Sequence, residues 1–192
     1  MNSSGVETEI KIAVADAADA ERRLREAGFE VSVPRVFESN QIYDWPGGTL
    51  RADRLLLRLR RVGDTFTLTY KGPPLLSGSG KHKSREEVEA RTTDGENLAA
   101  ILLRLGLEPS LRYDKYRTEL KQPGQSGTAM LDETPIGVFI ELEGPGDWID
   151  GAARALGFDE SVYITASYAA LYMSYCQAKS VGAGVGMVFL EP

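Results

Sequence analysis

The most regular feature of the sequence is a two-residue alternation of apolar and charged positions, which predicts half-buried β-strands. In residues 6–14, Ile10 belongs to an apolar face, whereas Glu7, Glu9 and Lys11 share the opposite face. The charged positions are unusual because they carry full charges of both signs. The same division recurs in residues 55–61, 65–71, 85–91 and 115–121, around Asp132, and in residues 138–143.

Apolar residues at helical spacing predict four α-helices between these strands. The predicted helices are residues 16–27, 95–105, 148–156 and 165–178. Asp16 is the expected N-cap of the first helix, and Thr93 and Glu96 have the spacing of a capping box before the second. Gly28 has the place of a left-handed C-cap, and glycines follow the next two helices in the same way. Helices and strands in this mixture predict the α+β class.

The length and composition are those of a single folded unit. The chain has 192 residues, of which 42% are hydrophobic and 26% charged. We expect one domain over residues 1–178 and a weakly ordered C-terminal tail over residues 179–192. Residues 72–80, which are rich in Gly, Pro and Ser, are expected to form a flexible loop.

Charge and rare residue types exclude several classes of protein. The net charge of −6 argues against nucleic acid as a partner, because the overall field repels it. Cys176 is the only cysteine, which excludes an intrachain disulfide and fits a reducing cytoplasm. The first residues lack the pattern of a signal peptide, and the sequence has no run of about 18 apolar residues. We therefore expect no membrane partner. His82, the only histidine, is expected in a solvated loop, so histidine-dependent triads are disfavoured.

The charged strand faces become informative when they are taken together. Any one of them is compatible with the solvent side of an antiparallel sheet. Combined, they place eight acids and nine bases on what can be one continuous surface. The acids are Glu7, Glu9, Glu87, Glu89, Glu119, Asp132, Glu141 and Glu143, and the bases are Lys11, Arg58, Arg60, Lys71, Arg85, Arg91, Lys115, Arg117 and Lys121. Such a density of charge requires a physical reason.

Repeated Glu-x-Glu pairs suggest that reason. Two carboxylates at positions i and i+2 of a strand lie about 7 Å apart and repel each other by roughly 2 kcal/mol at an effective dielectric near 20. The pairs are Glu7 with Glu9, Glu87 with Glu89, and Glu141 with Glu143. A shared Mg²⁺ or Mn²⁺ ion removes this repulsion and prefers such hard oxygen ligands. The neighbouring arginines and lysines suit a polyphosphate, since guanidinium groups bind phosphate oxygens in pairs.

The ordered series of these motifs resembles the CYTH superfamily, the triphosphate tunnel metalloenzymes, which include class IV adenylate cyclases and thiamine triphosphatases. Residues 7–11, Glu-Thr-Glu-Ile-Lys, are similar to the Glu-x-Glu-x-Lys signature of that family. The series continues in residues 57–60, 69–72, 85–89 and 115–117, at Asp132, and in residues 140–143, so that the resemblance spans about residues 5–176. It implies an antiparallel eight-stranded β-barrel, open at both ends, with a charged bore and helices packed outside.

The resemblance also implies roles for individual residues. The substrate-binding residues would be Lys11, Arg58, Arg60, Lys71, Arg85, Lys115 and Arg117. The ligands of one or two Mg²⁺ or Mn²⁺ ions would be Glu7, Glu9, Glu87, Glu89, Asp132, Glu141 and Glu143. We expect the catalytic cluster to comprise Glu7, Glu9, Lys11, Glu141 and Glu143. The acids of this cluster lie on the first and last predicted strands, which must adjoin if the barrel closes.

Three functions stay open at this point. The first is metal-dependent hydrolysis of inorganic triphosphate, a nucleoside triphosphate or thiamine triphosphate. The second is a class IV adenylate cyclase, in which the ribose 3′-hydroxyl attacks the α-phosphate and pyrophosphate leaves. The third is a module that binds polyphosphate or a nucleotide without turnover, which the complete Glu-x-Glu pairs disfavour. Related proteins make a homodimer an expectation.

Overall fold

All strands of the described residues belong to one barrel. The computed structural model describes residues 4–75, 81–184 and 186–190. The strands are β1 (Ser4–Val14), β2 (Glu30–Asp44), β3 (Leu56–Val62), β4 (Thr65–Lys71), β5 (Lys83–Thr92), β6 (Glu108–Lys121), β7 (Thr128–Thr134) and β8 (Gly137–Glu143). They are antiparallel and close in the order β1-β5-β4-β3-β2-β6-β7-β8. The predicted eight-stranded α+β barrel is therefore confirmed.

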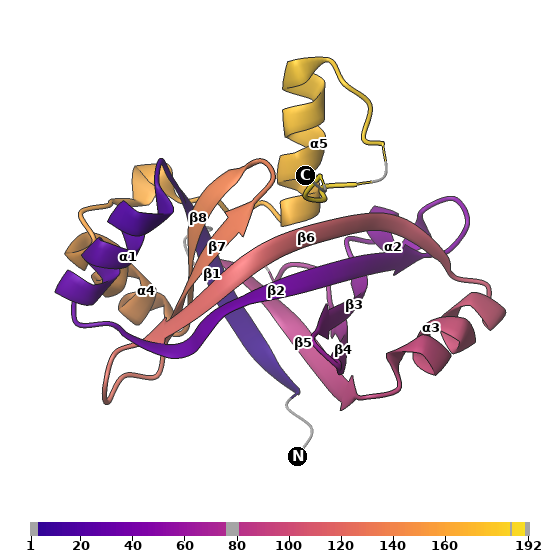
Figure 1. Cartoon of the computed structure of the whole chain (residues 1–192), viewed down its shortest axis with the longest axis horizontal. Coiled ribbons are helices and arrows are strands. Elements are labelled where there is room, and N and C mark those ends of the chain that lie inside the picture. The colour runs from indigo at the N-terminus through magenta and orange to yellow at the C-terminus, as the bar shows by residue number, and fades with distance from the viewer. Residues whose placement is uncertain (1–3, 76–80, 185, 191–192) are drawn as a thin grey trace.

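Helices surround this barrel on the outside. They are α1 (Ala17–Glu26), α2 (Thr49–Ala52), α3 (Gly95–Arg104), α4 (Gly146–Ala155) and α5 (Tyr168–Lys179), with a 3₁₀ turn at Glu160–Val162. Figure 1 shows α1 and α4 together on one side, α3 on the other, and α5 above β6. Among the described residues, no helix has the length and apolar character needed to cross a membrane.

The barrel closes where the first strand meets the last. β1 pairs with β5 along one edge and with β8 along the other. In the β1–β8 ladder, Glu9 lies opposite Glu143 and Lys11 lies opposite Glu141. Residues that face each other in an antiparallel ladder project to the same side of the sheet. The expectation that the first and last strands adjoin is confirmed, and it brings their charged faces together.

The main apolar core lies outside the bore, between the barrel wall and the helices. Ile10 and Ile12 of β1 and Leu142 of β8 pack there, fully buried, against Leu24 of α1 and Ile149 of α4. These strand residues alternate with the charged residues of the same strands. Since side chains alternate across a strand, an apolar outer face leaves the charged face to line the interior.

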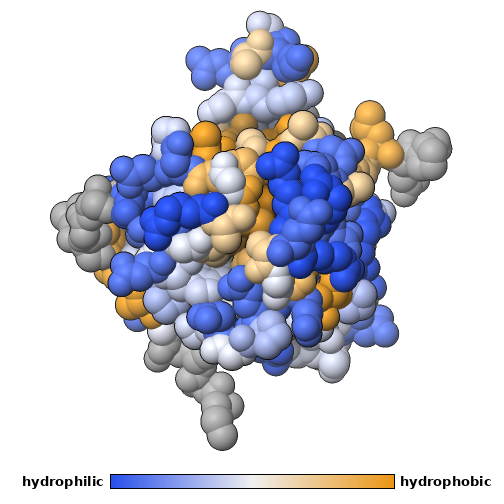
Figure 2. Space-filling view, turned by 90° about the vertical axis from the view of Figure 1, so that its left-hand side faces the viewer, coloured by the Kyte–Doolittle hydropathy of each residue, from blue (hydrophilic) through white to orange (hydrophobic). Residues whose placement is uncertain are grey.

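α1 illustrates how one helix meets both environments. The Asp16 carboxylate accepts a hydrogen bond from the backbone N–H of Asp19 at 2.8 Å, as predicted for the N-cap. Ala20 and Leu24 form the buried stripe. The outer face carries exposed ion pairs such as Arg25 with Glu21. Figure 2, which looks at the side of α1 and α4, shows hydrophilic residues over most of that face with hydrophobic residues between them.

Two elements were not predicted. β2 is the longest strand, but its alternation is broken by register irregularities between Val31 and Val36 and again at Tyr43. α2 has only four residues, which is too short for a periodic signal. The N-cap of α3 also differs from the prediction: Asp94, not Thr93, accepts the hydrogen bond from the N–H of Asn97.

Two segments expected to be loose make specific contacts. Met187 is 1% exposed, and its backbone pairs with the N–H of Asp114 and the carbonyl of Arg112 on β6. A single bridge of this kind leaves no pattern in the sequence. His82 contacts the Asp150 carboxylate of α4 at 2.8 Å instead of facing open solvent. Residues 76–80 of the predicted flexible loop lie outside the described residues.

Candidate active site in the barrel bore

The bore contains a cavity of about 400 Å³. Every residue predicted for catalysis, substrate binding or metal binding lines this cavity except Asp132, which is fully buried beside it. Arg91 and Lys121, which belong to the same charged faces, are exposed and lie outside the lining. The charged faces therefore converge on a shared interior, whereas the roles of the individual residues stay predictions.

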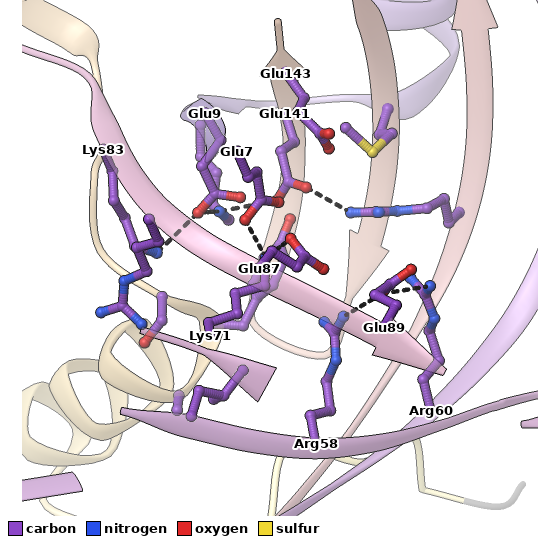
Figure 3. A pocket seen from close by; sticks show the side chains of 18 of the residues that line it. Glu7, Glu9, Arg58, Arg60, Lys71, Lys83, Glu87, Glu89, Glu141 and Glu143 are labelled. Carbon is purple, nitrogen blue, oxygen red and sulfur yellow. Dashed lines mark hydrogen bonds and ion pairs between the residues drawn. The ribbon is translucent and has the colours of Figure 1, made fainter. Parts of the chain in front are cut away.

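Five carboxylates gather in one part of the cavity. Glu7 and Glu9 come from β1, Glu141 and Glu143 from β8, and Glu87 from β5. In Figure 3 the carboxylates of Glu7, Glu9 and Glu141 lie side by side, with Glu143 next to them. The register explains this: β1 lies between β8 and β5, so three acidic strand faces are adjacent.

Lysines compensate part of this negative charge. The Lys11 ammonium lies 3.1 Å from Glu9 and 2.8 Å from Glu141, and Lys83 lies 2.8 Å from Glu9. Burial by itself would raise the pKa of Glu9, but Lys11 and Lys83 lower it to about 2. Lys71 contacts both Glu7 and Glu87. Glu9 and Glu141 are therefore charged at neutral pH.

Two of the carboxylates lack sufficient compensation. Burial, together with Glu7 and Glu141, raises the pKa of Glu143 to about 7. Burial and the neighbouring Glu7 also raise the pKa of Glu87 to about 8, although Lys71, which is shared with Glu7, lowers it. This part of the cavity thus contains more carboxylates than its lysines can neutralise.

The surplus of carboxylates fits a divalent metal ion. Mg²⁺ and Mn²⁺ take carboxylate oxygens as ligands. A bound ion would stabilise the deprotonated forms of Glu143 and Glu87, whose pKa values are raised without it. In the described ranges no three acidic, histidine or cysteine side chains already surround a common point at ligand distance. Glu7, Glu9, Glu141 and Glu143 are the residues whose position and chemistry suit such an ion, with Glu87 beside them.

Asp132 has a different environment from the other acids. Its carboxylate accepts hydrogen bonds from Arg117 Nε at 2.7 Å and Nη2 at 2.6 Å, from Lys115 at 3.1 Å and from the Tyr168 hydroxyl at 2.6 Å. Arg117 also donates to Glu141 at 2.9 Å. Four donors on one fully buried carboxylate form a tight network that fixes the two cations.

The arginines of β3 and β5 make looser ion pairs, although Arg58 also donates to the hydroxyls of Tyr113 and Thr69 at 3.1 and 3.2 Å. Arg60 lies 3.5 Å from Glu89 and 3.8 Å from Glu38, and Arg58 lies 3.9 Å from Glu89. These distances exceed the roughly 2.7–2.9 Å of a charge-assisted hydrogen bond. Within the described structure, the Nε atoms of Arg58 and Arg85 have no hydrogen-bond partner. These three guanidinium groups have donors to offer to an anion in the cavity.

α5 supplies residues that the sequence did not indicate. Tyr168, in its first turn, reaches the bore, and the Lys11 and Lys115 ammonium groups lie 5.1 and 5.2 Å from its ring centre. Tyr168 packs with Tyr113 and Phe139 in an apolar cluster at this end of the barrel. α5 therefore lies over one end of the bore, where the resemblance implies an opening.

Other site residues escaped the sequence reasoning for identifiable reasons. Lys83 continues the alternation of β5 two residues before Arg85, so the pattern itself contained this signal. Glu38 and Asn40 lie on β2, which was not recognised as a strand. Tyr113 receives a hydrogen bond from Arg58 at 3.1 Å, a contact that only the barrel creates.

Known structures share this architecture. A solved protein of Vibrio parahaemolyticus, described as a "putative adenylate cyclase", is similar with a TM-score of 0.73 and 19% identity, covering 86% of this chain and 97% of that one. A Hippeastrum protein described as a "putative adenylyl cyclase" with "a dominant" triphosphatase activity matches with a TM-score of 0.55 and 15% identity, covering 93% and 98%. At these identities the likeness shows the fold.

Sequence comparison goes further. A Methanocaldococcus jannaschii protein named "Putative adenylate cyclase" is 28% identical over 138 residues, covering 72% of this chain and 76% of its own length. The family model of the CYTH domain matches residues 5–155, which include β1 to β8 and the carboxylates and cations of the cavity. The chain therefore belongs to the CYTH domain family.

Proposed function

We propose that this protein hydrolyses a triphosphate compound with the help of Mg²⁺ or Mn²⁺ ions. The observation that carries the proposal is the division of one cavity into a carboxylate-rich part and a part with loosely held arginines. A metal–triphosphate complex has the matching chemistry, because its metal needs oxygen ligands and its phosphates need cationic donors. The name of the Hippeastrum protein, which refers to triphosphatase activity, supports the same direction.

The carboxylates of β1 and β8 would hold the metal. Glu7, Glu9, Glu141 and Glu143 form the cluster, and the crowding that raises the pKa of Glu143 to about 7 is relieved when a cation is shared. When bound, a divalent ion polarises phosphate oxygens and lowers the pKa of a coordinated water. In this proposal Asp132 and Glu89 orient cations, because Asp132 accepts from Arg117 and Glu89 lies 3.5 Å from Arg60.

The cations would bind and orient the phosphates. Arg58, Arg60 and Arg85 have donors to offer, and Lys11 and Lys71 line the same cavity and pair with its carboxylates. Arg117 is fixed by Asp132, so it presents its charge without moving. Positioning and electrostatic stabilisation of the phosphates are the main catalytic contributions expected of such a site.

The second candidate is an adenylate cyclase, which the name of the M. jannaschii relative favours. Both reactions require a metal–triphosphate complex in the same cavity, but the nucleophile differs: water for hydrolysis and the ribose 3′-hydroxyl for cyclisation. Incubation with ATP and Mn²⁺ separates them. Orthophosphate release supports hydrolysis, whereas cyclic AMP together with pyrophosphate supports cyclisation.

The site assignment is tested with tripolyphosphate, ATP and thiamine triphosphate, each with Mg²⁺ or Mn²⁺. Glu9→Gln should reduce metal-dependent turnover at least about 100-fold, because it removes a charged ligand. Arg58→Ala should mainly raise KM, by about tenfold or more, because it removes a phosphate contact. Glu133→Gln is the control, since Glu133 pairs with Arg35 on the outer wall. Unchanged kinetics of both cavity variants would exclude the assignment.

A further inference from the structure

A buried acid next to the cavity, Glu38, belongs to neither the carboxylate cluster nor the tight Asp132 network. It lies just behind the cavity lining, beside the lining residues Arg60 and Lys115. Glu38 of β2 is 4% exposed and lies opposite Lys115 in the β2–β6 ladder. Its carboxylate is 3.5 Å from the Lys115 ammonium and 3.8 Å from the Arg60 guanidinium. Burial by itself would raise the pKa of Glu38, but Lys115, Arg117 and Arg60 lower it to about 2. A full negative charge therefore sits among cations that are expected to bind phosphate.

The contacts of Glu38 are loose. At 3.5 and 3.8 Å they are longer than charge-assisted hydrogen bonds, and Glu38 Oε2 has no hydrogen-bond partner in the described structure. Asp132, by contrast, receives Arg117 at 2.6 and 2.7 Å. Asp132 therefore fixes Arg117 and Lys115, whereas Glu38 adds only long contacts to Lys115 and Arg60, so another anion can replace Glu38 at these two cations.

Asn40 is a second buried polar residue close to Glu38 and Arg60. Asn40, two positions along β2, is fully buried, and neither its side-chain oxygen nor its side-chain nitrogen has a partner in the described part of the chain. It lies opposite Arg60 on one side and Tyr113 on the other, so all three project to the same side of the barrel wall. Asn40 lies behind the cavity lining next to Arg60, and its unpaired buried carboxamide can hydrogen-bond a ligand atom or water that reaches Arg60.

Resting on the proposed function, we propose that Glu38 is a built-in competitor for the anion: it neutralises Arg60 and, together with Asp132, Lys115 in the ligand-free protein, and a phosphate that also contacts Asn40 replaces it at Arg60 and Lys115. The group bound there is a phosphate of the substrate or of a product such as pyrophosphate. Because Glu38 and the phosphate repel each other, affinity for short phosphate products stays low and their release is eased. Glu38 is thus a specificity-determining residue of the phosphate site.

The experiment is a calorimetric titration of the full chain with pyrophosphate in the presence of excess Mg²⁺. Glu38→Gln keeps the shape and removes the charge, so it should bind pyrophosphate at least about tenfold more tightly than the parent. Glu38→Asp, which keeps the charge, should stay near the parent. Glu133→Gln, which removes the same charge from the outer wall of the barrel, should not change the affinity.

If Glu38→Gln does not fold, Asn40→Asp tests the proposal through the opposite change in pyrophosphate affinity. It adds a second carboxylate of nearly the same shape at the subsite, so pyrophosphate binding should weaken about tenfold or more. The proposal is overturned if folded Glu38→Gln binds no more tightly than the parent, or if Asn40→Asp binds as tightly as the parent. Tighter binding by Glu38→Gln in a protein that hydrolyses no triphosphate would refute the proposed reaction and leave this inference standing.

Discussion

At the scale of single residues, the carboxylates of the bore differ in what neutralises them. Glu9 and Glu141 are paired with lysine at about hydrogen-bond distance, and Asp132 is saturated by four donors. Glu143 has no lysine or arginine within ion-pair distance in the described residues. We therefore expect the charge of a paired carboxylate to stabilise the folded protein and the charge of Glu143 to destabilise it.

Glu143→Gln should stabilise the metal-free protein at high pH. The folded-state pKa of Glu143 is raised to about 7, through burial and the carboxylates of Glu7 and Glu141, above its ordinary value of 4.5. The unfolded chain then loses its proton first, so the folded state loses stability as pH rises from about 4.5 to about 7. Denaturant unfolding in EDTA should show a gain of about 1–3 kcal/mol for the variant at pH 8 and little difference at pH 4.5. A variant less stable than the parent at pH 8 would contradict this account.

Asp132→Asn should have the opposite effect on stability. It removes the charge that compensates Arg117 and Lys115 in a fully buried position. Breaking one side of a buried ion pair costs about 3–5 kcal/mol. Urea unfolding at pH 7 should show this loss, whereas Glu133→Gln, at the neighbouring exposed pair with Arg35, should cost less than about 1 kcal/mol. Equal, small losses in both variants would mean that the Asp132 network does not support the fold.

At the scale of elements, the connection between β2 and β3 places the arginines of the site. The Asp44 carboxylate, at the end of β2, accepts hydrogen bonds from the backbone N–H groups of Trp45, Leu50 and Arg51 at 2.8, 2.8 and 3.1 Å. These bonds hold the turn and the start of α2 against the barrel. β3, which carries Arg58 and Arg60, begins four residues after α2 ends.

Asp44→Ala should therefore affect both stability and substrate binding. Three backbone donors lose a buried charged acceptor, which should lower the free energy of unfolding by about 2–3 kcal/mol. Asp16→Ala, which removes one exposed cap of α1, should cost about 1 kcal/mol. KM for the triphosphate substrate should rise in Asp44→Ala alone, because β3 is shifted. A normal KM in Asp44→Ala would show that β3 is positioned independently of this turn.

At the scale of the whole molecule, the barrel places its apolar faces outward and its charges inward. The strand residues Ile10, Ile140 and Leu142 are fully buried under helices, while charged residues of the same strands line the cavity. In the empty state the bore contains like charges held close together. Ligands that neutralise them must therefore stabilise the fold as they bind.

Mg²⁺ and pyrophosphate together should raise Tm more than either does alone. A ligand at 100 times its Kd stabilises the native state by about 2.7 kcal/mol. For a chain of this length, that corresponds to an increase of roughly 5–10 °C. Thermal unfolding with each component alone and with both measures the coupling. A full shift with pyrophosphate alone would mean that the carboxylate cluster takes no part in binding.

The helices with regular spacing were predicted within three residues of their observed limits, and most strands with regular alternation within two, because these patterns reflect local geometry. β6 is the exception, since it begins at Glu108, seven residues before the predicted start. β2 was missed because its bulges interrupt the alternation, and with it Glu38 and Asn40. Tyr168 could not be assigned to the bore, because its contact with Asp132 joins α5 to β7 across 36 residues.

The sequence by itself determined which face of each strand is charged, since side chains alternate along any extended chain. Together with the motif series, that was enough to predict the barrel and the set of charges inside it. Only the tertiary structure decided which charges neutralise each other: Asp132 is saturated, Glu143 has no cationic partner among the residues that the structure describes, and Glu38 is held loosely. The physical reason is that ion pairing depends on distances of a few ångströms between different strands. The closure and register of the barrel set these distances, and local sequence does not.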